Sequence, residues 1–168
     1  MRKQITMERT FDATLDEVWE LWTTKEGIES WWGPEGFETK VEKLELRVGG
    51  ALHYAFTAVG VQQVEFMKQS GQPLTQFMKA RYTLVQPKTL AAWQNLVEFI
   101  PGITPYEVET RVELEKRGKQ VRVKLRFDAM HDEQFTRYAE MGWTEELGKL
   151  DRLLKQRGGL SAGAKSGE

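Results

Sequence analysis

The chain has 168 residues, enough for one domain of ordinary size. Its 24 basic and 25 acidic residues leave a formal net charge of −1, so no overall field attracts a nucleic acid. The absence of cysteine excludes disulfides, thiolate catalysis and zinc sites with cysteine ligands. We expect a cytoplasmic protein, because no signal-peptide core is visible and no run reaches the roughly eighteen apolar residues of a membrane helix.

The first predicted elements are a strand and two helices. Residues 3–11 alternate between polar and apolar, which is typical of a strand. Thr14 is followed three residues later by Glu17, a capping box that predicts the start of a helix with apolar residues at helical spacing. A second short helix is predicted over residues 25–30, and the Gly-Pro-Glu-Gly segment at 33–36 predicts a turn.

A hairpin is predicted next. Residues 37–48 indicate a strand, with Leu44, Leu46 and Val48 in one phase and the earlier apolar positions in another. A bulge near Glu42-Lys43 would reconcile the two phases and bend the strand. Gly49-Gly50 then predicts a tight turn into a second alternating strand, which ends at Ala58.

The middle of the chain combines one helix, two strands and an apolar loop. Residues 60–75 lack strand periodicity and predict a short amphipathic helix, which would serve either as a lid or as a plug at one end of the core. Residues 89–98 are apolar on both faces and indicate a central strand. We expect the unusually apolar loop at 99–106 to be buried, at the mouth of a cavity. The strand predicted over residues 77–85 places four side chains on one face: Met78, Ala80, Tyr82 and Leu84.

The last hairpin and the last helix have the clearest patterns. Apolar residues within 108–114 and 121–127 share one face across a turn at Gly118, and charged residues occupy the other. The charged face pairs an acidic strand with a basic one and lacks the aromatic side chains of an RNA-binding sheet. A helix is predicted to begin at Asp132 and to end at Gly158-Gly159, and its apolar stripe comprises Phe135, Ala139, Trp143, Leu147, Leu150 and Leu154.

This order of elements indicates an α+β fold. The apolar face of a single antiparallel sheet must be covered, and the C-terminal helix is the one element long enough to cover it. We therefore expect a curved antiparallel sheet wrapped around a long C-terminal helix with an internal apolar cavity. A single domain is predicted over residues 1–157, followed by a flexible tail over residues 158–168.

Four segments of the chain form a recognisable series: Phe11-Asp12-Ala13 leading into Val18-Trp19, Trp31-Trp32-Gly33-Pro34, Val48-Gly49-Gly50, and Gly142-Trp143 followed by leucines. In this order and spacing they resemble a known family, the bacterial homologues of the activator of heat-shock protein 90 ATPase, in the START-like or SRPBCC superfamily that includes the birch-pollen allergen. The resemblance covers about residues 3–155 and implies a helix-grip fold with a pocket between sheet and helix. It implies no fixed chemistry, because the superfamily includes lipid carriers, hormone receptors, polyketide cyclases and co-chaperone modules.

No sequence motif compels a reaction. Zinc-protease, nucleotide-binding and serine-hydrolase signatures are absent. His53 falls in the outward phase of its strand. His131 precedes Asp132 and Glu133, but adjacent residues do not point at one centre, and acids are common at helix starts for dipole reasons. We predict no catalytic residue, no metal and no cofactor.

The leading hypothesis is a protein that binds an apolar or amphipathic small molecule, such as a lipid, a polyketide or an aromatic compound. The inward hydroxyls of Tyr54, Tyr82 and Thr110, and an amide at Gln94 or Asn95, fit either ligand contacts or satisfied core groups. The predicted ligand-binding residues are Trp32, Phe37, Tyr54, Phe56, Phe66, Tyr82, Trp93, Phe99, Val112, Phe135 and Trp143.

Two other functions compete with ligand binding. One is a co-chaperone-like interaction module that stimulates a chaperone ATPase, and the other is a cyclase- or hydrolase-type enzyme that acts in the same cavity. An unpaired edge strand would allow a homodimer. Neither a nucleic acid nor a membrane is an expected partner.

Overall fold

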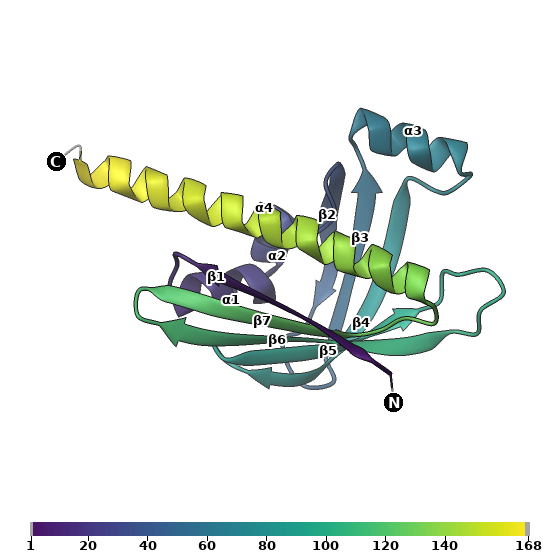
Figure 1. Ribbon diagram of the computed structural model, residues 1–168, viewed down its shortest axis with the longest axis horizontal. Coiled ribbons are helices and arrows are strands. Elements are labelled where there is room, and N and C mark those ends of the chain that lie inside the picture. Colours follow the sequence, from purple (N-terminus) through teal and green to yellow (C-terminus); the bar gives the residue numbers. More distant parts are fainter. Residues whose placement is uncertain (1, 167–168) are drawn as a thin grey trace.

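Figure 1 shows the computed structural model, which describes the backbone of residues 2–166 and the side chains of residues 2–158. One seven-stranded antiparallel sheet has the strand order β1-β7-β6-β5-β4-β3-β2. The predicted α+β fold, with one antiparallel sheet and a long C-terminal helix, is confirmed. The elements in chain order are β1 (Gln4–Phe11), α1 (Leu15–Thr23), α2 (Lys25–Trp31), β2 (Phe37–Leu44), β3 (Ala51–Ala58), α3 (Val61–Gln69), β4 (Thr75–Gln86), β5 (Leu90–Val97), β6 (Tyr106–Arg117), β7 (Gln120–Asp128) and α4 (Glu133–Ser166).

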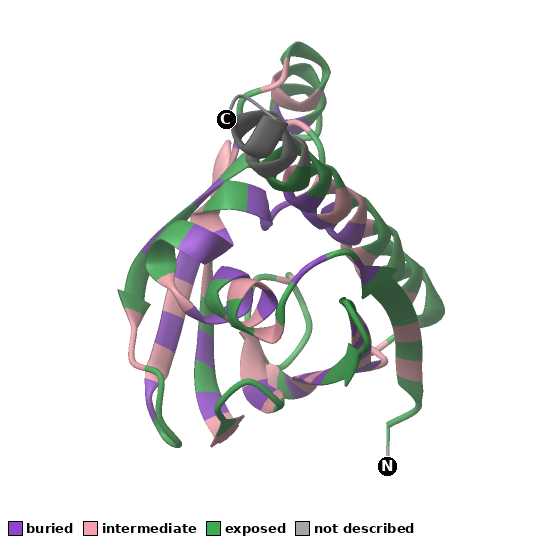
Figure 2. Cartoon of the chain, turned by 90° about the vertical axis from the view of Figure 1, so that its left-hand side faces the viewer, coloured by how far each residue is buried: buried purple, intermediate pink, exposed green. Residues whose placement is uncertain are grey.

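The helices are distributed unevenly over the curved sheet. Figure 2 shows the strands curving around the short helices α1 and α2, while α4 crosses above them. Contacts join α1 to β6, α2 to both β2 and α4, and α4 to β1. The side of the sheet that faces these helices is called the concave face below. None of the described helices is both long and apolar enough to cross a membrane.

The two short helices begin as the sequence predicts. The Thr14 hydroxyl accepts from the Glu17 amide at 3.1 Å, and the Glu17 carboxylate accepts from the Thr14 amide at 3.3 Å, which completes the capping box. Thr24 ends α1 and begins α2, because its hydroxyl donates to the Glu20 carbonyl and accepts from the Gly27 amide. A Cβ at Gly27 would lie 2.4 Å from that carbonyl, so only glycine allows the helices to approach so closely.

Two irregularities bend the sheet, and the sequence predicted one of them. The pairing of β2 with β3 shifts register between Val41 and Lys43, at the expected bulge. The pairing of β4 with β5 shifts between Tyr82 and Leu84, which was not expected. Beyond that shift Val85 packs against the core. The prediction that Leu84 shares the inward face of Tyr82 is therefore wrong.

The turn between β2 and β3 is longer than predicted. Strand β2 ends at Leu44, and Leu46 and Val48 are exposed in the connection. Local hydrogen bonds account for the difference, because the Gly50 amide donates to Arg47 and the Gly49 amide donates to the Tyr82 carbonyl. These bonds hold the segment as a turn that leans on β4, with Gly49 at a positive φ of 84°.

The apolar loop between β5 and β6 is not buried, which corrects another prediction. Phe99 is 48% exposed and Ile103 is also exposed. The Ile103 amide donates to the Ile100 carbonyl, and Gly102 adopts a positive φ. The loop therefore satisfies its own backbone in a local turn and does not depend on packing against the core.

The predicted helix at residues 60–75 is confirmed as α3, which projects beyond the strands in Figure 1. Its one buried side chain is Met67, and it contacts the sheet through β3. Phe66 points away and is 65% exposed. This placement separates Phe66 from the concave face.

The last hairpin is confirmed, with Val112 opposite Leu125 in the buried layer. On the outer face Arg122 contacts Glu8 at 2.7 Å and Glu115 at 3.8 Å. The charge pairing is less regular than predicted, because two arginines, Arg111 and Arg126, stand opposite each other. These exposed pairs contribute little stability.

Helix α4 extends further than the sequence predicts. The Asp132 carboxylate accepts from the Phe135 amide at 2.8 Å and caps the first turn. The helix continues through Gly158-Gly159 to Ser166, so the predicted end at those glycines is wrong. Glycine in a helix costs only about 1 kcal/mol relative to alanine and need not end it. The predicted tail at 158–168 lies largely outside the residues whose side chains are described, and its flexibility stays a prediction.

Candidate functional site

The apolar stripe of α4 divides into a buried half and a partly exposed half. Leu147, Leu150 and Leu154 are buried in the main core. Trp143 and Ala139, one and two turns earlier, are only partly buried at the edge of that core. The C-terminal part of the stripe therefore anchors the helix, and the N-terminal part packs less completely.

Aromatic side chains fill the concave face under the middle of α4. Trp143 stacks on Trp22 of α1 with ring centroids 5.7 Å apart. Trp32 lies 5.7 Å from Trp93 and 5.2 Å from Tyr54, also between centroids. Rings at these separations are in stacked and edge-to-face contact with one another. The internal cavity expected from the sequence stays a prediction.

A partly exposed apolar patch lies beside this aromatic cluster. Phe56 and Met78 alternate in phase with the buried residues Tyr54 and Ala80, so their exposed surface opens on the concave side. Met78 stands directly opposite Tyr54 across the β3–β4 pair. We group Phe56 and Met78 of the sheet with Ala139 and Trp143 of α4 as the edge patch; each is among the partly buried side chains that pack against the core.

Polar atoms on the concave face differ in how well they are satisfied. The Asn95 amide donates to the Thr110 hydroxyl at 2.9 Å and to the Val108 carbonyl at 3.2 Å, so these groups are paired within the core. The Tyr82 hydroxyl and the indole N–H groups of Trp22 and Trp32 are enclosed and have no hydrogen-bond partner among the described side chains. Burial raises the pKa of Tyr82, which keeps its hydroxyl protonated.

Edge-to-face packing gives a physical account of the unpaired indoles. The ring planes of Trp22 and Trp31 meet at 70°, and those of Trp32 and Tyr54 meet at 84°. In such arrangements a ring edge points at a neighbouring π face, where an N–H group forms a weak hydrogen bond. These N–H groups are buried components of the core.

Glu146 is a buried carboxyl group that the sequence analysis missed. Glu146 is only 7% exposed, and its Oε1 accepts a hydrogen bond from the Gly33 amide at 2.7 Å. Burial raises the pKa of Glu146 to about 7, although the Gly33 hydrogen bond and the charge of Lys149 act in the opposite direction. No ion pair within residues 2–158 includes this carboxyl group. The detectable signal was an acid three residues after Trp143 and four before Leu150, on the apolar stripe itself.

Four side chains of α4 hold the loop at residues 33–36. Lys149 donates to the Gly33 carbonyl at 2.9 Å, and the Glu145 carboxylate accepts from the Glu35 amide at 3.0 Å. Arg152 pairs with the Glu35 carboxylate, and Glu146 binds the Gly33 amide as described above. Gly33 has a φ of 98°, and a Cβ there would lie 2.8 Å from the Thr39 hydroxyl. Trp32 directly precedes this loop, and Lys149 also donates to the Trp32 carbonyl at 3.5 Å, so α4 holds the backbone that carries the central indole.

The structure places the predicted ligand-binding residues in three different environments. Five are buried in the core, namely Trp32, Tyr54, Tyr82, Trp93 and Val112. Four are partly exposed, namely Phe37, Phe56, Phe135 and Trp143. Phe66 and Phe99 are exposed on α3 and on the β5–β6 loop, and the structure does not bring them together with the others. Ligand contact by any of these residues stays a prediction.

The histidines occupy separate positions. His53 lies on the outer side of β3, opposite Lys43 and Lys79. His131 has its Nδ1 at 2.8 Å from the Tyr106 hydroxyl, which also accepts from the His131 amide. The residues that the structure describes contain no group of three histidine or acidic side chains suited to a metal ion. His131 thus serves to tie the start of β6 to the segment before α4.

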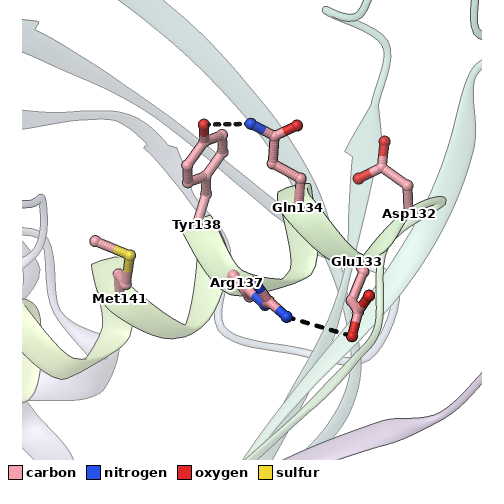
Figure 3. Close-up of a pocket in the computed structure, with 6 residues that line it drawn as sticks. All are labelled: Asp132, Glu133, Gln134, Arg137, Tyr138 and Met141. Atoms are coloured by element: carbon pink, nitrogen blue, oxygen red, sulfur yellow. Dashed lines mark hydrogen bonds and ion pairs between the residues drawn. The ribbon is translucent and has the colours of Figure 1, made fainter.

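Two shallow hollows lie along one side of α4, away from the edge patch. Figure 3 shows the first, where Gln134 donates to the Tyr138 hydroxyl at 2.7 Å and Arg137 pairs with Glu133 at 3.5 Å. The second continues along the same helix to Glu145. Because the walls come from α4 and its capping residue alone, neither hollow encloses a ligand.

Comparison with solved structures identifies the same architecture in several bacterial proteins. A protein from Chromobacterium violaceum is 22% identical with a TM-score of 0.74, and the match covers 90% of this chain and 96% of that one. The AHSA1 protein of Silicibacter pomeroyi is 18% identical with a TM-score of 0.72, over 92% and 99% of the two chains. An AHSA1-like protein of Aeromonas hydrophila is 18% identical with a TM-score of 0.71, over 93% and 94%.

These similarities establish the fold. A comparison of the sequence with curated proteins finds no match. The family model described as "Activator of Hsp90 ATPase homolog 1-like protein" matches residues 12–155. The chain therefore belongs to the family of proteins similar to the activator of heat-shock protein 90 ATPase.

Proposed function

We propose that this protein binds an apolar or amphipathic small molecule between the N-terminal half of α4 and strands β3 and β4. The change in burial along α4 supports the proposal. The apolar stripe of α4 is buried at Leu147, Leu150 and Leu154 but partly exposed at Ala139 and Trp143. A helix that only covered a core would be expected to bury its whole stripe.

The opposite wall supports the same location. Phe56 and Met78 are partly buried and keep some apolar surface accessible on the concave side. A ligand between these walls would remove apolar surface from water on both sides, at about 25 cal/mol per Å². Small-molecule sites combine such apolar walls with a few polar groups. Here the adjacent polar groups are the Tyr54 hydroxyl and the Glu146 carboxyl.

A fluorescent probe tests this proposal. N-phenyl-1-naphthylamine becomes brighter in apolar surroundings, and we expect its emission to rise on binding to the wild-type protein. The Ala139→Trp variant would fill the proposed ligand space and abolish the rise. The matched control is Thr144→Trp, on the exposed side of the same helix, which leaves the rise unchanged. Equal emission with the wild type and Ala139→Trp would contradict the proposed location.

Stimulation of a chaperone ATPase is a second candidate, favoured by the family description and by apolar side chains around α3. Val61, Phe66 and Phe77 are all exposed there. We expect Phe66→Ser to weaken any stimulation of the bacterial heat-shock protein 90 ATPase, while Ala139→Trp leaves it intact. Absence of stimulation by the wild-type protein would remove this candidate.

A further inference from the structure

We propose that Glu146 is the recognition group for a basic amine, so that the ligand is a protonated organic amine with an apolar body. This inference rests on the proposed small-molecule function and specifies its chemistry. It is carried by one buried carboxyl group with a free oxygen, by the rings around it, and by the absence of a pairing cation from residues 2–158.

The two oxygens of Glu146 have different surroundings. Oε1 accepts from the Gly33 amide at 2.7 Å. Within the described side chains, Oε2 makes no hydrogen bond, and it is not among the fully enclosed polar atoms. A Cβ built at Gly142 would meet only this oxygen, at 4.0 Å. Glycine at that position therefore leaves room next to Oε2 for another group.

Four aromatic residues lie close to the segments that carry this carboxyl group and its partner Gly33. Trp143 precedes Glu146 by one turn, and Trp32 adjoins the glycine that binds it. Phe56 lies 3.5 Å from the position of a Cβ at Gly33. Tyr54 is near enough for the Glu146 charge to raise its pKa, after the larger effect of burial. The faces of such rings attract cations, and they do so most strongly where water is excluded.

No described side chain forms an ion pair with this carboxyl group. The charge of Lys149 acts on Glu146 and lowers its pKa, but the Lys149 ammonium donates to the carbonyls of Gly33 and Trp32. Burial outweighs this charge and the Gly33 hydrogen bond, so the pKa of Glu146 is raised and the group is held partly protonated. An ammonium group would supply the missing charge and donate a short, charge-assisted hydrogen bond to Oε2.

A neutral ligand with a carbonyl group is the competing possibility, because protonated Glu146 could donate to it. The nearby aromatic rings discriminate between the two possibilities, because their negative faces attract a cation and repel the partial negative charge of a carbonyl oxygen. They also differ in proton linkage. Amine binding would require ionised Glu146 and release a proton, whereas carbonyl binding would require the neutral acid and take one up.

Three probes with one body and different head groups separate these outcomes: 4-phenylbutylamine, 4-phenylbutan-1-ol and 4-phenylbutyrate. Displacement of N-phenyl-1-naphthylamine at pH 7 gives their relative affinities. We expect the amine to bind about tenfold more tightly than the alcohol, and the carboxylate to bind least. The Glu146→Gln variant should lose this advantage of the amine and keep the affinity for the alcohol. The control Glu140→Gln, an exposed acid on the same helix, should change neither.

A second measurement needs only the wild-type protein. Calorimetry of amine binding in two buffers of different ionisation enthalpy should show release of about half a proton at pH 7. The alcohol should show no release. Lys149, Glu145, Tyr54 and Glu35 are the other titratable groups near this site, and burial raises the pKa of Glu146 to about 7, where this release would occur.

The outcomes distinguish this inference from the proposed function. If the alcohol or the carboxylate binds as tightly as the amine, or if Glu146→Gln retains the amine preference, the amine site is wrong while ligand binding stands. If N-phenyl-1-naphthylamine does not bind and none of the three compounds binds either, both the amine site and the proposed function are wrong. Proton uptake on binding of the amine would also overturn the inference.

Discussion

Replacing Glu146 by glutamine should change how the stability of the protein depends on pH. The ordinary pKa of a glutamate is 4.5 and the folded protein raises that of Glu146 to about 7, mainly through burial. Between these values the folded state binds the proton more strongly than the unfolded state. The contribution of this group is therefore most favourable below the unfolded pKa and declines as the pH rises to about 7.

The size of the effect follows from the separation of the two pKa values. A gap of roughly two and a half pH units corresponds to about 3 kcal/mol, and this is an upper bound because the buried site can relax. Lys149 and the Gly33 amide already oppose the shift, and Glu145 reinforces it. Tyr54 stays neutral across this range because burial raises its pKa.

Urea unfolding followed by tryptophan fluorescence at pH 5 and pH 8 measures the effect. The wild-type protein should lose about 2–3 kcal/mol of unfolding free energy relative to Glu146→Gln between these two pH values. Comparison with the variant cancels the contribution that the exposed acids make to the pH dependence of stability. Glu8 and Glu45 are among them, and because their pKa values are lowered, their contributions to stability increase as the pH rises. A difference between the two proteins that is the same at both pH values would refute the assignment of the shift to Glu146.

Three further predictions concern packing and helix stability. Gly27→Ala should destabilise the protein by about 1–3 kcal/mol, because the new Cβ would lie 2.4 Å from the Glu20 carbonyl oxygen and 2.7 Å from the Leu21 Cα; an unchanged urea midpoint would contradict this close approach. Leu150→Ala, in the buried half of the α4 stripe, should lower the free energy of unfolding in urea by about 2–5 kcal/mol. Phe66→Ala, on exposed α3, should change this free energy by no more than about 0.5 kcal/mol. Similar losses for both variants would show that the burial pattern is wrong. Gly142→Ala and Gly148→Ala should each stabilise the protein by about 0.5–1 kcal/mol and raise its melting temperature, because both sites have room for a Cβ and glycine weakens helices. A lower melting temperature for Gly142→Ala alone would indicate that the space beside Glu146 is narrower than in the structure.

Local patterns in the sequence predicted much of the fold. The Thr14–Glu17 capping box and the β6–β7 hairpin depend on residues close in the chain, and the structure confirms both. The bulge near Val41 was also visible, because the apolar residues change phase there. The shift after Tyr82 was hidden, since Leu84 and Val85 are both apolar and either could face the core.

Predictions about burial failed where a local turn competes with packing. The β5–β6 loop is apolar, yet its own hydrogen bonds satisfy its backbone and leave Phe99 in water. The end of α4 was misplaced because Gly158-Gly159 weakens a helix without stopping it. The location of Glu146 needed the three-dimensional structure, because its partner Gly33 lies 113 residues away in the chain.

Nuclear Overhauser contacts between bound N-phenyl-1-naphthylamine and methyl groups of the protein test most directly where the ligand lies. Three methyl groups mark the alternatives, since Met78 and Ala139 belong to the edge patch and Met141 lies on the exposed side of α4. We predict contacts from the probe to Met78 and Ala139 and none to Met141. Contacts to Met141 alone would place the ligand in the shallow hollow of Figure 3 and contradict a site between α4 and the sheet.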